Sequence, residues 1–174
     1  MSSLEIFITS LRLLKRRGMV SGLGLGRSPS FVRGLILGRV GVAFCVGLSE
    51  EASKLDKIFE AWGLDVYSVA CKCGAVDKTK IGLEEKDKLK PGLYEPMCNP
   101  VLQAMVLNHV GTELNIVVGL CVGHDTLFMR FSKAPIVYLI AKDRATGHNP
   151  AAPLYSPHYF SKRILPHELN PYES

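Results

Sequence analysis

The sequence contains no apolar run of the roughly 18 residues that a membrane-spanning helix needs, although 47% of its residues are hydrophobic. Charged residues make up only 21% of the 174 positions. These fractions are typical of a globular protein, and the length is sufficient for one domain with a core. We therefore expect a soluble protein without a membrane span.

Acidic residues are almost absent from the first 38 positions, where Glu5 stands alone against six basic residues. The rest of the chain holds equal numbers of acids and bases, so the net charge of +5 comes from this segment. Gly18–Ser30 is rich in glycine and serine, and no small-residue cleavage site follows a long apolar core. We expect residues 1–38 to form a basic, weakly ordered extension. We expect no nucleic-acid partner, because the folded part has no basic excess.

A dinucleotide-binding fingerprint is also missing, because the glycines of Gly22–Gly26 have the wrong spacing and follow no strand. From residue 39 onward, however, strand and helix patterns alternate. Continuous apolar runs, typical of strands buried on both faces, predict strands at 40–46, 66–70, 116–120 and 135–140. The alternation predicts an α/β fold with a three-layer parallel sheet of about four strands, flavodoxin-like or Rossmann-like, in the order 2-1-3-4.

The helix boundaries support this assignment. Ser49 and Asn99 are predicted caps, Pro100 suits a first helical turn, and Asp125 is predicted to cap a short helix ending near Phe131. Residues 74–97 form a polar, lysine-rich segment too long for a plain loop, predicted to be functional or partly helical. Five prolines after about residue 143 predict a surface tail without long helices. We expect residues 39–174 to form one domain.

The five cysteines include no Cys-x-x-Cys pair and do not form a small secreted disulfide framework. An odd number of scattered cysteines is typical of thiols or metal ligands in a reducing compartment, which indicates the cytoplasm. Four of them close predicted strands, and Cys98 opens a helical segment. The carboxyl ends of parallel strands share one edge, where ligands bind. The sequence therefore predicts a thiol-rich site at that edge, formed by Cys45, Cys71, Cys73, Cys98 and Cys121.

The first hypothesis is a metal site. Four thiolates suit either zinc or an iron–sulfur cluster, between which the sequence does not decide. The predicted ligands are Cys71, Cys73, Cys98 and Cys121, with Cys45, His124 and His148 in reserve. Because Cys45 ends an apolar run, burial in the core is the competing interpretation for it.

The second hypothesis is thiol chemistry, in a thiol-dependent enzyme or redox protein. Cys98 and Cys121 each precede a predicted helix, whose dipole favours the thiolate form. His124 could serve Cys121 as a base with Asp125 orienting it, although adjacent side chains tend to diverge. The sequence names no substrate, partner or oligomeric state for either hypothesis.

The third hypothesis is a small-molecule or phosphate site that needs no metal. Gly119–Asp125 would offer free backbone N–H groups at a helix start, with Gly123 and Asp125 as binding residues. Lys142, Asp143 and Arg144, at the end of the fourth predicted strand, could assist.

Four segments in combination resemble an uncharacterised prokaryotic family, DUF1847-like, over about residues 39–155: Cys71-Lys-Cys-Gly74, Cys98-Asn-Pro100, Gly119-Leu-Cys-Val-Gly-His-Asp125 and Lys142-Asp-Arg-Ala-Thr-Gly-His-Asn-Pro150. Members of that family are usually labelled as cysteine-rich, metal-binding proteins with a domain of unknown function. The resemblance implies that the five cysteines, His124 and His148 match family positions, and it implies no reaction. Family members tend to begin with a further cysteine cluster, whereas residues 1–38 of this chain contain no cysteine, so its amino-terminal segment is divergent.

Overall fold

The computed structural model describes residues 38–164. The extension expected at residues 1–38 therefore lies almost wholly outside the described range, as does the tail after residue 164. The elements are β1 (Arg39–Phe44), α3 (Ser49–Ala61), β2 (Asp65–Ala70), α4 (Pro100–Val110), β3 (Leu114–Val118), α5 (His124–Phe131), β4 (Ile136–Ile140), α6 (Ala152–Tyr155) and α7 (Pro157–Ile164). No helix in this range is long and apolar enough to cross a membrane.

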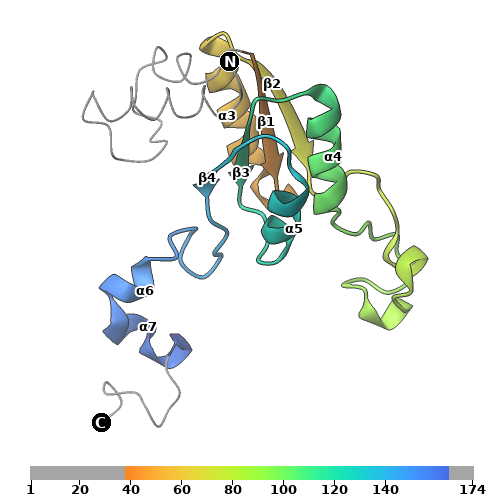
Figure 1. Cartoon of the computed structure of the whole chain (residues 1–174). Helices are drawn as coiled ribbons and strands as arrows, with labels where there is room; N and C mark the ends of the chain where they lie inside the picture. The colour runs from red at the N-terminus through yellow and green to blue at the C-terminus, as the bar shows by residue number, and fades with distance from the viewer. Residues whose placement is uncertain (1–37, 165–174) are drawn as a thin grey trace.

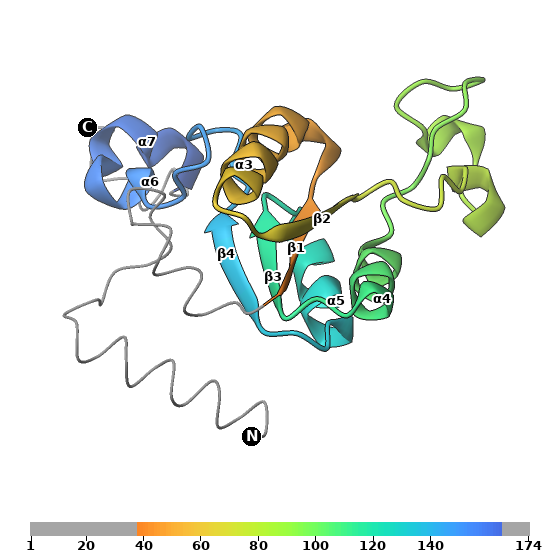
Figure 2. The ribbon, with the colours of Figure 1, turned by 90° about the horizontal axis from the view of Figure 1, so that it is seen from above.

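The four strands form one parallel sheet in the order β2-β1-β3-β4, which confirms the predicted topology. Helix α3 covers one face of the sheet, and α4 and α5 cover the other (Figures 1 and 2). The predicted boundaries were wrong by one or two residues at several strand ends. In particular, β1 ends at Phe44 and β3 ends at Val118, so Cys45 and Cys121 lie beyond their strands.

The core is built on the two central strands. Val40 and Val42 of β1 and Ile116 of β3 are at most 1% exposed, because both faces of the sheet are covered. Their burial removes apolar surface from water, at about 25 cal/mol for each Å². Gly41 allows α4 to approach closely, since a Cβ there would overlap Leu107. The rigid centre of the sheet fixes where the strand ends lie.

The helix starts correct two of the predicted caps. Asn99 does cap α4, accepting a hydrogen bond from the Leu102 N–H at 2.9 Å, with Pro100 as the first helical residue. Ser49, by contrast, is already inside α3 and makes no cap. Helix α5 begins at His124 with Gly123 as its cap, two residues earlier than the predicted cap Asp125, because Gly123 turns the chain with a φ of 87°.

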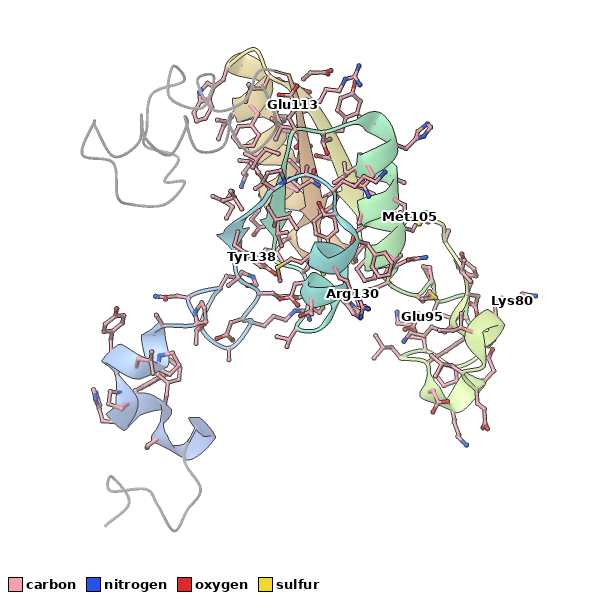
Figure 3. The ribbon with its side chains drawn as sticks, viewed as in Figure 1. Lys80, Glu95, Met105, Glu113, Arg130 and Tyr138 are labelled. Atoms are coloured by element: carbon pink, nitrogen blue, oxygen red, sulfur yellow. The ribbon has the colours of Figure 1, made fainter. Side chains whose placement is uncertain are left out.

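Residues 74–97, here called the lysine lobe, project from the sheet after β2 (Figure 2). As predicted, the lobe is partly helical, with short 3-10 turns at Lys78–Ile81 and Glu85–Asp87. Figure 3 labels Lys80 and Glu95 on the lobe, and both lie well apart from Tyr138 on β4. The buried Lys88 ammonium group lies at its centre and donates to Asp77, Glu85 and the Leu93 carbonyl. The lobe is therefore held by its own ion pairs.

Helices α6 and α7 form an arm that follows β4. With four and eight residues they agree with the expectation of a tail without long helices. The arm lies apart from the sheet in Figure 1, rather than along its surface as expected. The lysine lobe and the arm both leave the sheet at the edge where the strands end.

Candidate thiol site

Four thiols gather at the carboxyl edge of the sheet, and all of them are free. Cys45 follows β1, Cys71 follows β2, Cys121 follows β3, and Cys98 precedes α4. Backbone hydrogen bonds fix these segments: the Cys71 N–H donates to Phe44, and the Asn99 N–H donates to the Cys71 carbonyl at 2.7 Å. We refer to these four cysteines and Lys142 as the thiol cluster.

Cys71 and Cys98 form the first half of the cluster. Their Sγ atoms lie 3.6 Å apart, and the Val46 N–H points at the Cys71 sulfur from 3.3 Å. Cys71 is 2% exposed, whereas Cys98 is half-buried. Burial raises the pKa of Cys71 to about 12, and negative charge on Cys98 and Cys45 adds to the effect. The pair therefore combines an inner, protonated thiol with an outer, accessible one.

Lys142, just past β4, joins the second half. Its Nζ lies 2.8 Å from the Cys45 sulfur and 3.1 Å from the Cys121 sulfur. Burial would raise the pKa of Cys45, but the hydrogen bond from Lys142, the Gly47 backbone N–H and the lysine charge outweigh it and lower that pKa. Burial would likewise lower the pKa of Lys142, yet its contacts with both thiols raise it. The geometry thus favours a thiolate–ammonium pair.

The two halves adjoin, because the Cys71 side chain is close enough to Cys45 to contribute to the lowering of the Cys45 pKa. The contacts run in series from Cys98 through Cys71 and Cys45 to Lys142 and Cys121. Arg144 lies next to this series: a Cβ on Gly47 would be 3.0 Å from its Nη2 and 3.9 Å from the Cys45 sulfur. Glycine at position 47 therefore leaves room for a guanidinium group beside the thiols.

Cys73 is placed outside the cluster. Its thiol donates to the Asn99 carbonyl at 3.6 Å, and burial, with a smaller contribution from the charge of the nearby Cys98, raises its pKa. The neighbouring Lys72 points elsewhere, donating to the Pro96 carbonyl at 2.7 Å. The structure thus brings Cys45 into the thiol cluster and leaves Cys73 beside it.

The two histidines occupy separate turns. His124 is the first residue of α5 and is half-buried. His148 has a φ of 67°, and its Nδ1 accepts a hydrogen bond from the Asp143 N–H at 3.1 Å. Within residues 38–164, neither imidazole hydrogen-bonds a cluster thiol. The structure therefore does not join His124 or His148 to the cluster by a direct contact.

The Gly119–Asp125 turn is occupied by its own side chain. The Asp125 carboxylate accepts from the Gly123 N–H at 2.9 Å and from the Thr126 N–H at 2.8 Å. It also faces Tyr138, whose pKa is raised by burial and by this carboxylate. A phosphate would have to displace Asp125 to reach these donors, because like charges repel.

The cluster offers only part of what a bound metal ion needs, which is several converging donors. Among the described residues, no three or more His, Cys, Asp or Glu side chains are arranged to hold a metal ion. The Cys71–Cys98 separation of 3.6 Å is nevertheless close to the roughly 3.8 Å between two thiolates on one tetrahedral zinc with Zn–S bonds of about 2.3 Å. The spacing of Cys71 and Cys98 therefore fits two ligand positions of a tetrahedral metal site. The sulfur atoms of Cys45 and Cys121 instead contact the Lys142 ammonium group.

One supporting residue was missed by the sequence reasoning. Gln103 on α4 is fully buried, and its Nε2 donates to the Phe44 and Val69 carbonyls at the ends of β1 and β2. Its Oε1 is buried without a partner in the described part of the chain. The signal was a single polar residue within the apolar first turns of this helix. Gln103 ties α4, and with it Cys98, to the strand ends.

The fold and the site together define an α/β protein with free thiols at the carboxyl edge of a parallel sheet. The chain belongs to the family described as protein of unknown function (DUF1847), whose model matches residues 29–139, and the expected family resemblance is confirmed. It is 47% identical over 126 residues to the uncharacterized protein MJ0455 of Methanocaldococcus jannaschii, which covers 72% of this chain. The chain spans 63% of that relative's length. No solved structure matches the chain.

Proposed function

We propose that this protein carries out thiol–disulfide exchange, with Cys98 as the attacking thiol and Cys71 as the resolving thiol. The observation that carries this proposal is the 3.6 Å separation of their sulfur atoms. A disulfide has an S–S length of about 2.05 Å, so the pair closes with a shift of only ~1.5 Å. The half-buried Cys98 is accessible to a substrate, whereas Cys71 is only 2% exposed and contacts the Cys98 sulfur.

The exchange balances without a metal or a cofactor. The Cys98 thiolate attacks one sulfur of a small disulfide, forms a mixed disulfide and expels the first substrate thiolate. Cys71, once deprotonated, attacks the Cys98 sulfur, forms the Cys71–Cys98 disulfide and expels the second substrate thiolate. The two cysteine protons end on the two released thiols, and the two electrons pass from the protein to the substrate.

The second step is expected to be the slow one. Because burial raises the pKa of Cys71 to about 12, little of this thiol is ionised near neutral pH. The fraction of thiolate grows as the pH rises towards that value, so resolution of the mixed disulfide should accelerate with pH. The rate increases with pH because the fold favours the neutral thiol of Cys71, which must lose its proton before it can react.

The test uses the reduced full-length chain and a disulfide reagent whose thiol product absorbs visible light. We expect both thiols of the reagent to be released and peptide mapping to find a Cys71–Cys98 bond. Cys71→Ser should stop at a mixed disulfide on Cys98, and Cys98→Ser should abolish the bond. Cys73→Ser is the matched control, since the hydrogen bond of Cys73 goes to the Asn99 carbonyl rather than to a cluster thiol. A wild-type protein that accumulates no Cys71–Cys98 bond would exclude the proposal.

A thiophilic metal is the second candidate. It is favoured by the near-tetrahedral Cys71–Cys98 spacing and by the arrival of Cys45 and Cys121 from two further segments. Zinc or an iron–sulfur cluster held there would require Lys142 to release Cys45 and Cys121. Metal analysis and a visible spectrum of anaerobically purified protein test this. Stoichiometric metal that is lost in both Cys71→Ser and Cys98→Ser would support it, and metal-free protein would exclude it.

A further inference from the structure

We propose that the disulfide taken up by the thiol cluster is anionic, a small disulfide carrying carboxylate groups. This inference rests on the proposed exchange and adds the substrate class. It is carried by the placement of two cations, Lys142 and Arg144, at the edge where the thiols gather.

Lys142 is the inner cation. Its Nζ contacts the sulfur atoms of both Cys45 and Cys121. Cys45 in turn lies close enough to Cys71 of the redox pair for each to influence the pKa of the other. Its ammonium group is partly buried. Water and salt screen a partly buried charge less than a charge at the surface. Lys142 therefore contacts two of the four thiols directly, and Cys71 and Cys98 follow Cys45 in the same series.

Arg144 is the outer cation. It is exposed, its Nη2 lies over Gly47 beside Cys45, and it forms no ion pair with any acid of residues 38–164. A guanidinium group presents several N–H donors in a planar fork that matches a carboxylate. Arg144 is thus a cation beside reactive sulfur with its donors open to a ligand.

The acids close to this edge in the sequence are mostly engaged elsewhere. The Asp143 carboxylate accepts from Ala145 and Thr146 within its own turn. Asp125 is held by the turn before α5. Glu50 pairs with Lys54 along α3, and Glu51 is exposed on the same first turn. These hydrogen bonds leave the acids charged, and Lys142 is paired with Cys45. Arg144, the guanidinium beside Cys45 that is unpaired within residues 38–164, is therefore the group that would attract an anionic reactant.

The experiment compares three disulfides of similar length with the reduced full-length protein. They are dithiodipropionate, which carries two carboxylates, the neutral hydroxyethyl disulfide, and cystamine, which carries two ammonium groups. We expect the rate of Cys71–Cys98 bond formation to fall in that order. The anionic reagent should react at least ~10-fold faster than the cationic one at low salt, with a smaller ratio at high salt.

Variants locate the effect. Arg144→Gln should bring the three rates closer together by slowing the anionic reagent, while Arg144→Lys should retain much of the preference. Lys133→Gln removes the same charge three residues before β4, near the opposite end of that strand, and should leave the ratio unchanged. Arg144 is exposed, so these variants should fold, which thermal unfolding checks.

The outcomes separate this inference from the proposed function. If none of the three reagents yields the Cys71–Cys98 bond, thiol–disulfide exchange itself fails. If all three yield it at equal rates, or if cystamine is fastest, the exchange stands and the anionic substrate class is overturned. A preference that survives Arg144→Gln at full size would also overturn the role given to the two cations together.

Discussion

Gly119 connects the buried end of β3 to the turn that carries Cys121. Its φ of 62° lies in the left-handed region, which favours glycine. A Cβ at this position would lie 2.7 Å from Cδ2 of the buried Leu48 side chain. Gly123, four residues on, has a φ of 87° but open space where its Cβ would be. A side chain at Gly119 would therefore cause both backbone strain and steric overlap, whereas a side chain at Gly123 would cause backbone strain alone.

We expect Gly119→Ala to lower the free energy of unfolding by about 2–4 kcal/mol, through overpacking against Leu48 together with backbone strain. Gly123→Ala should cost only about 1 kcal/mol, because it adds strain alone. Urea unfolding followed by circular dichroism measures both. Equal losses in the two variants would show that contact with Leu48 does not restrict this turn.

Among the elements, the lysine lobe depends on charge rather than on an apolar core. The side chain of Lys88 is 4% exposed and donates to Asp77 and Glu85. Asp77 also accepts from the backbone N–H groups of Thr79 and Glu95. Hydrogen bonds from Thr79, then Glu95, and the contact with Lys88 hold the pKa of Asp77 well below its ordinary range. One carboxylate and one ammonium group thus connect most of the lobe.

Replacing Lys88 should therefore open the lobe without unfolding the sheet. We expect Lys88→Met to increase amide hydrogen exchange across residues 74–97 at neutral pH, because Asp77 and Glu85 lose their common partner. Exchange in β1 and β3 should be unchanged. Lys80→Met, which removes an exposed lysine of the same lobe, is the control and should alter neither. Faster exchange throughout the sheet would contradict local opening.

Acid should have a comparable effect on the lobe. Because the pKa of Asp77 is lowered in the folded state, its contribution to stability is complete above the unfolded pKa of about 3.9 and is lost as the pH falls below it. Protection factors for lobe amides should therefore decrease on acidification before those of β1 and β3. Protection that is independent of pH through this range would argue against the role given to Asp77.

For the whole molecule, burial is concentrated in the two central strands and decreases towards the arm. Val40 and Val117 are completely buried, whereas Leu154, Tyr155 and Tyr159 of the arm are 77%, 82% and 77% exposed. Figure 1 shows the arm apart from the sheet. Local opening requires little free energy where few apolar groups are buried.

We expect hydrogen exchange to follow this gradient. Amides of β1 and β3 should exchange only through global unfolding, while those of α6 and α7 should exchange fastest among the helices from α3 onward. Mass spectrometry of peptic fragments at increasing labelling times provides the measurement. If the amides of the arm were as well protected as those of α4, the expected gradient would be wrong. The arm would then have to be packed more tightly than its exposed aromatic residues indicate.

Much of the architecture could be predicted because its determinants are local. Continuous apolar runs marked the four strands, and Asn99 followed by Pro100 marked the start of α4. The strand order 2-1-3-4 is that of the flavodoxin-like class, which the alternation of strands and helices indicated. Boundaries were less well predicted, as for Ser49, because the end of a helix depends on neighbouring turns as well as on the capping residue.

The chain order of apolar runs and turn residues was enough to place the cysteines at the carboxyl edge of a parallel sheet. It could not decide which thiols touch, since a side chain one residue past a strand end can point in several directions. Packing settled this: Cys71 meets Cys98, Cys45 meets Lys142, and Cys73 turns to the Asn99 carbonyl. A contact between residues 45 and 142 depends on the relative positions of two strand ends, and those positions exist only once the core has formed.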